Sequence, residues 1–234
     1  MRKTIAMVVG ALVAVSVQAQ TIIYDVITGA TTAGFTTQAG NNLAGDNYLP
    51  PAAGAGNFWR ITEISFIVVF TNAGNHSITD VGVDFYNQVD TVAGTPALSS
   101  HAGGFNGSTG SIMTSGANEA LSLTFGGFTL DLAPAAGNSN GYGVQLSMNS
   151  FTGPGLATFV YVDNPSTVGS WSNGFLLDLD NDGVLEGDEF ANFSGWTNGN
   201  LALSMTASAV PEPASMIALG IGAAALMARR RRRK

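Results

Sequence analysis

The sequence contains no cysteine, so disulfide bonds cannot stabilise the fold. Positive charge is nearly as scarce in the middle of the chain. Of the nine Lys and Arg residues, only Arg60 lies between residues 20 and 209, whereas fifteen of the sixteen Asp and Glu residues lie there. This stretch therefore carries a net charge of −14, against −7 for the whole chain. Such a surface repels phosphate backbones, which excludes nucleic acid as a partner, and it attracts divalent cations.

The N-terminus has the pattern of a secretory signal. A basic start over residues 1–3 is followed by an apolar stretch over residues 4–15 and by small residues ending at Ala19. This pattern predicts a signal peptide over residues 1–19 that is removed after Ala19 on export.

The C-terminus predicts a second membrane segment. Residues 214–228 carry no charge, and six basic residues follow from Arg229 to Lys234. A helix of fifteen residues spans roughly 22 Å, which is short for a hydrocarbon core of about 30 Å. The basic run holds the C-terminus in the cytoplasm, so the preceding residues lie on the far side of the membrane.

The tripeptide Pro211, Glu212 and Pro213 stands just before this apolar segment. The tripeptide, the apolar helix and the arginine cluster together resemble the PEP-CTERM sorting signal of Gram-negative bacteria that make exopolysaccharide. The resemblance covers residues 210–234. It implies that an exosortase, a membrane-embedded transpeptidase, recognises the tripeptide and removes the tail, so the protein is anchored transiently and then displayed on the surface or released. An ordinary membrane anchor behind a proline-rich stalk is the alternative.

The residues between the two signals predict one all-β domain, residues 20–209. Thirty glycines, with many Asn, Ser and Thr, separate short runs of β-branched and aromatic residues. Strands are expected at residues 21–28, 58–71, 77–87, 119–132, 142–148, 156–162 and 200–209. About eight antiparallel strands without a helical period favour a jelly-roll-like two-sheet sandwich.

Details of the expected strands can be read from the alternation. Within residues 77–87, one face carries Val81, Val83 and Phe85 and the other carries Asp80, Gly82 and Asp84. The pair Gly126-Gly127 predicts a bulge or a tight hairpin. Residues 29–57 and 94–116 are expected to be long loops, the first with a minor strand near Phe35.

Residues 178–189 read DLDNDGVLEGDE and satisfy the calcium-loop pattern D-x-[DN]-x-[DN]-G-x5-E at every position. Calcium takes six to eight oxygen ligands, which this spacing supplies by winding the chain once around the ion. The predicted ligands are the carboxylates of Asp178, Asp180, Asp182, Glu186 and Glu189 and the backbone carbonyl of Val184. The loop resembles that of the EF-hand over twelve residues, but no helix is expected before it and only one copy is present. The resemblance therefore implies a structural Ca²⁺, and a solvated acidic turn is the alternative.

No catalytic constellation is evident, so the chain is not expected to be an enzyme. The two histidines, His76 and His101, are expected in solvated loops, and no nucleophile elbow, phosphate loop or zinc cluster is present by motif. A hydrolase of extracellular glycan would need two carboxylates within about 10 Å in a cleft. Asp80 and Asp84 are expected to be solvated surface charges.

The favoured function is a non-enzymatic surface or matrix protein associated with exopolysaccharide. The alternative is a calcium-dependent carbohydrate-binding module. Trp171 and Trp196 flank the acidic loop in sequence, and an exposed indole can stack on a sugar ring, although most tryptophans in a β-sandwich belong to the core.

Overall fold

The computed structural model describes residues 19–28, 35–36, 43–54, 57–92, 95–132, 141–163, 166–170, 175–177, 190–191, 199–211, 220–222 and 229. The acidic loop 178–189 lies outside the described residues, as do residues 1–18 of the predicted signal peptide. Four further predicted site residues also lie outside: Trp171, Trp196, Glu212 and Pro213. The strands that flank the acidic loop, and Pro211 of the sorting motif, are described.

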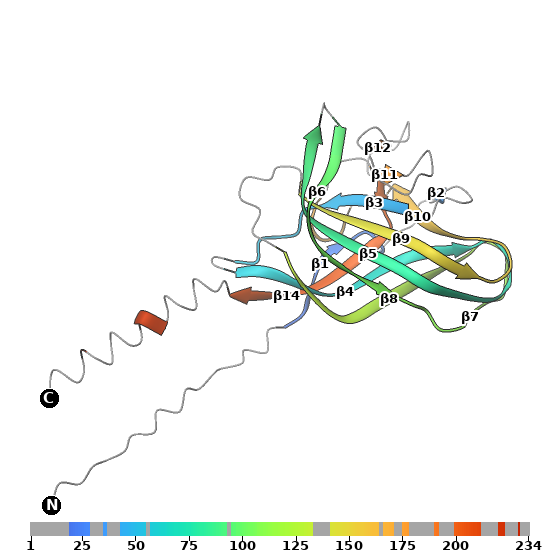
Figure 1. Cartoon of the computed structure of the whole chain (residues 1–234), viewed down its shortest axis with the longest axis horizontal. Coiled ribbons are helices and arrows are strands. Elements are labelled where there is room, and N and C mark those ends of the chain that lie inside the picture. The colour runs from blue at the N-terminus through green and yellow to red at the C-terminus, as the bar shows by residue number, and fades with distance from the viewer. Residues whose placement is uncertain are drawn as a thin grey trace, which may run out of the picture.

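The described residues form fourteen strands in two antiparallel sheets that pack face to face (Figure 1). The first sheet has the order β1 (Thr21–Asp25), β14 (Leu203–Pro211), β4 (Asn57–Phe70), β10 (Ala157–Asp163) and β13 (Gly199–Leu201), with β8 (Glu119–Asp131) paired to β4 and β2 (Phe35–Thr36) to β10. The second has the order β12 (Phe190–Ala191), β11 (Phe175–Leu177), β3 (Leu43–Tyr48), β9 (Tyr142–Thr152), β5 (Gly74–Val92) and β6 (Thr95–Gly107), with β7 (Ile112–Thr114) paired to β5. The predicted all-β two-sheet sandwich is confirmed, with more strands than expected.

Apolar side chains from both sheets meet in one core. The alternation predicted for residues 77–87 is confirmed, because Val81, Val83 and Phe85 on β5 have no exposed surface. On β4 the period of two breaks once, since the buried residues Ile61 and Ile64 are three positions apart. A bulge shifts the pairing of β4 with β14 at this point, which lets both isoleucines point inward.

Strand β6 corrects the prediction of a long loop over residues 94–116. It pairs with β5 from Val81 opposite Gly107 to Val92 opposite Thr95. Its glycines suggested a loop, but they are sites of close approach: a Cβ on Gly107 would lie 2.8 Å from the ring of Phe125 on the facing sheet. The glycines therefore reflect packing between strands rather than turns. Strand β7 lies in the same stretch.

Strand β3 corrects the prediction of a loop over residues 29–57. Its sequence, LAGDNY, has little of the β-branched character typical of strands. All six residues are buried, and β3 pairs with β9 on one side and β11 on the other. Tertiary contacts therefore impose a strand where local preference does not. The minor strand expected near Phe35 is present as β2.

The paired glycines at 126 and 127 form a bulge and not a hairpin. Strand β8 continues through them, while its pairing with β4 steps from Gly126 opposite Glu63 to Leu130 opposite Ile61. Gly127 has a φ of +83°, which a residue without a Cβ adopts at little cost.

The two predicted terminal helices fall largely outside the described residues. Residues 220–222 of the C-terminal segment are helical. Across the described part of the chain, no helix is both long enough and apolar enough to cross a membrane.

Candidate functional site

Both segments predicted to be removed leave the sandwich at the same end. Strand β1 begins at Thr21, which pairs with Ala207 in the middle of β14, so the chain before Thr21 leaves β1 on the side of the second half of β14. Strand β14 ends at Pro211, which pairs with Asn57, the first residue of β4. Figure 1 shows the end of β14 beside the start of β4, with β7 at the opposite end of the molecule. We call the region around Thr21, Asn57 and Pro211 the terminal end.

The sorting motif begins on the last residue of β14. Val210 and Pro211 are paired with Phe58 and Asn57, so the ladder reaches the first proline of the motif. Proline has no N–H to donate, which helps to end the strand there. The sandwich therefore runs into the sorting motif without an intervening linker.

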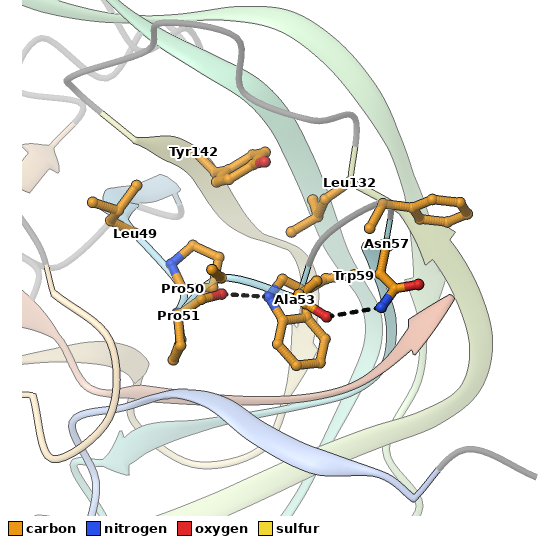
Figure 2. Close-up of a pocket in the computed structure, with 11 residues that line it drawn as sticks. Leu49, Pro50, Pro51, Ala53, Asn57, Trp59, Leu132 and Tyr142 are labelled. Atoms are coloured by element: carbon orange, nitrogen blue, oxygen red, sulfur yellow. Dashed lines mark hydrogen bonds between the residues drawn. The ribbon is translucent and has the colours of Figure 1, made fainter. Parts of the chain in front are cut away.

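A pocket of about 290 Å³ opens at the terminal end (Figure 2). Its walls are mainly apolar and aromatic, and none of the residues that line it is charged. Among them are Leu49, Pro50, Pro51, Trp59 and Tyr142. Trp59 comes from β4 and is half-buried.

Hydrogen bonds inside the pocket hold its wall in shape. The Trp59 Nε1–H donates to the carbonyl of Pro51 at 2.6 Å, and the Asn57 side-chain amide donates to the carbonyl of Ala53 at 3.2 Å. Because these groups are already paired, a ligand meets mostly apolar surface. The pocket suits a hydrocarbon chain or the apolar face of a sugar ring.

A buried carboxylate joins the two sheets. Asp46 on β3 is 1 % exposed, and its oxygens accept hydrogen bonds from the N–H of Asn47 and from the N–H of Leu201 on β13 of the facing sheet, both at 2.7 Å. Burial raises the pKa of Asp46 well above its ordinary value, although the two N–H donors oppose the shift. Burial and the nearby Asp46 also raise the pKa of Tyr24, whose hydroxyl donates to Asn200 at 3.1 Å. No local sequence pattern marked Asp46.

His76 was predicted to be in a solvated loop, and this was wrong. It lies on β5, is 1 % exposed and packs its ring between Phe70 and Phe151, with centroid distances of 4.6 and 5.8 Å. Its Nε2 lies 2.9 Å from the hydroxyl of Thr114 on β7 and 3.1 Å from the carbonyl of Asn72. The polar neighbours in sequence gave no sign of this burial, which depends on the phenylalanines of β4 and β9.

The second histidine is exposed, as predicted, although it lies on β6 rather than in a loop. His101 Nε2 is 2.7 Å from the carboxylate of Asp84, and the two side chains are 53 % and 36 % exposed. Asp84 is therefore a partly exposed charge on the polar face of β5.

Strands rather than helices flank the acidic loop. Residues 178–189 connect β11 to β12, and these strands pair antiparallel, with Phe175 opposite Ala191 and Leu176 opposite Phe190. The chain thus enters and leaves the loop at neighbouring positions. This agrees with the expectation that no regular helix precedes the loop. Elsewhere, the described residues contain no cluster of three or more His, Cys, Asp or Glu that could hold a metal ion.

Comparison with known families decides the role of the C-terminus. Residues 209–233 match the family model of the PEP-CTERM protein-sorting motif. The C-terminal segment is therefore a PEP-CTERM sorting motif. The motif marks an exported protein that an exosortase-type enzyme processes at the membrane, for the cell surface or the extracellular space. The match begins at Ala209, inside β14, so the sorting signal overlaps the last strand of the sandwich. No curated protein and no solved structure matches the chain.

Proposed function

We propose that this PEP-CTERM protein is a non-enzymatic component of the cell surface or of the extracellular matrix. The observation that carries the proposal is the direct continuation of a packed β-sandwich into the sorting motif at Pro211. Residues 214–228 anchor the precursor in the membrane, and removal of the tail releases or displays the domain. Intact-mass analysis of surface and secreted material tests this: the chain should begin near Gln20 and lack the basic residues 229–234.

The acidic loop supplies a structural calcium site in this proposal. The fully matched ligand pattern supports it, with Asp178, Asp180, Asp182, Val184, Glu186 and Glu189 as the ligands. The pairing of β11 with β12 supports it too. The strand before the first predicted ligand and the strand after the last one are neighbours, so the acidic loop begins and ends at adjacent strands. The ion then stabilises the fold instead of the disulfide bonds that a cysteine-free exported domain lacks.

Calcium is expected to raise the melting temperature of the full chain by a few degrees. A ligand at ten times its dissociation constant that binds only the native state adds about 1.4 kcal/mol. The rise should vanish in Glu189→Ala, which removes a ligand, and persist in Asp188→Ala, which removes a neighbouring charge that is not a ligand. Thermal melts with calcium, magnesium or chelator provide the measurement. Identical curves in all three would reduce the loop to a solvated turn.

A calcium-dependent carbohydrate-binding module is the second candidate, and the pocket favours it. Leu49, which lines the pocket, exchanges two backbone hydrogen bonds with Ser170, and Trp171 is the next residue along the chain. The predicted sugar-stacking residue is therefore one position in sequence from Ser170, the residue that pairs with Leu49 of the pocket wall.

Co-sedimentation with exopolysaccharide extracted from the producing cells tests this second candidate. The wild-type chain should co-sediment in the presence of calcium, and Trp171→Ala should lose most of the binding. The variant Trp196→Ala tests the second predicted stacking residue in the same assay. Equal binding by the wild type and both variants would count against sugar stacking.

A further inference from the structure

We infer that the terminal end of the sandwich rests on the membrane surface until the tail is removed, with the pocket at Trp59 turned toward the lipid. The inference rests on the proposed function, because it takes residues 214–228 as the anchor. It adds a defined orientation and a lipid-facing role for the pocket.

The length of chain between the last strand and the anchor carries the argument. Only Glu212 and Pro213 lie between Pro211 and Ala214, and the three residue steps from Pro211 to Ala214 span at most about 11 Å in a fully extended chain. Pro211 is paired with Asn57, which lines the pocket, and paired residues lie roughly 5 Å apart. While the anchor is inserted, the pocket wall therefore stays within roughly 16 Å of the anchor's first residue.

The opposite end of the sandwich has no such constraint. Strand β4 has fourteen residues, so Phe70 lies roughly 43 Å from Asn57 along the strand. Strand β7, with Met113, is attached at that far end through its pairing with residues 74–76 of β5. The geometry therefore distinguishes one end of the domain from the other.

The surface chemistry of the terminal end suits lipid contact. No charged residue lines the pocket, and its wall carries Leu49, which is 39 % exposed, and the half-buried Trp59. Tryptophan favours the boundary between lipid and water. The single cation of the domain, Arg60, lies at this end and pairs with Asp131 at 2.5 Å, which neutralises one of its many carboxylates. A pocket without charged residues, beside an ion pair whose charges cancel, lets this acidic domain approach a membrane.

Site-specific fluorescence in reconstituted full-length chain tests the orientation. Because the chain has no cysteine, Ala52→Cys, Met113→Cys and Ala224→Cys each provide one site for an environment-sensitive NBD label. Ala52 lines the pocket, Met113 is 71 % exposed at the far end, and Ala224 reports insertion of the anchor. The labelled chains are reconstituted into phosphatidylcholine vesicles with and without nitroxide-labelled lipid.

The labels at positions 52 and 224 should lose most of their emission to the nitroxide lipid and shift to the blue, while the label at position 113 stays unquenched. Quenching at 224 without quenching at 52 would overturn the orientation and leave the anchor intact. Equal quenching at 52 and 113 would also overturn it, because no single end would then face the lipid. An unquenched label at 224 would refute the anchor, and with it both proposals.

Discussion

Replacement of Glu212 by alanine is expected to leave the chain with its C-terminal tail attached. Glu212 is the middle residue of the tripeptide in the PEP-CTERM motif, and it follows directly after the last strand residue, Pro211. The loss of processing should be nearly complete, because an enzyme that recognises a short linear motif makes few other contacts with its substrate. The precursor should accumulate in the membrane fraction and the released form should disappear, as measured by fractionation and intact mass.

A matched control separates recognition from folding. Glu63→Ala makes the same chemical change at an exposed position of β4, and it should be processed like the wild type. The melting temperature of Glu212→Ala should equal that of the wild-type chain, since the residue lies beyond the strands. Normal release of Glu212→Ala would show that the enzyme does not read this position.

Asp46 is expected to make the stability of the sandwich depend on pH in a direction opposite to that of most carboxylates. Burial raises its pKa in the folded state above the ordinary value of about 3.9. The folded state therefore holds this proton more tightly than the unfolded state does. The resulting stability is complete below the ordinary pKa and is lost as the pH rises through the raised pKa of the folded state.

Asp46→Asn should remove this dependence, because an amide keeps a carbonyl acceptor for a backbone N–H but does not ionise. The free energy of unfolding of Asp46→Asn should increase relative to that of the wild type as the pH rises from 4. The difference between the two proteins isolates Asp46, since they share every other carboxylate. Urea unfolding at a series of pH values measures it, and parallel curves for the two proteins would rule Asp46 out as the titrating group.

Asp46→Ala should be strongly destabilising at low pH, where the wild-type carboxyl is protonated in the folded state. It leaves the N–H of Leu201 without its acceptor in a buried position, which costs about 1–3 kcal/mol. For a domain of this size that lowers the melting temperature by roughly 2–12 °C. Asp131→Asn is the matched control, because it removes an exposed carboxylate whose ion pair with Arg60 contributes little. A loss in the control equal to that in Asp46→Ala would contradict the role of burial.

The sequence by itself determined where this protein goes and what class of fold it has. Signals such as Pro211-Glu212-Pro213 are contiguous because the enzymes that read them bind a short stretch of chain, so no tertiary structure is needed to recognise them. The alternation of Val81, Val83 and Phe85 likewise records burial on one face of a strand, which is a local property.

Only the tertiary structure decided which residues without a local signal belong to the core. β3 is a strand because β9 and β11 pair with it. The glycines of β6 are required because a Cβ at Gly103 or Gly107 would meet β8 of the facing sheet, and a Cβ at Gly104 would meet the neighbouring β5. His76 and Asp46 are buried by residues far away in sequence, and their polar neighbours predicted the opposite. The pocket at Trp59 depends on the same long-range contacts, because its lining comes from residues 49–54, the start of β4, Leu132 and Tyr142 of β9, and no single segment encodes their meeting.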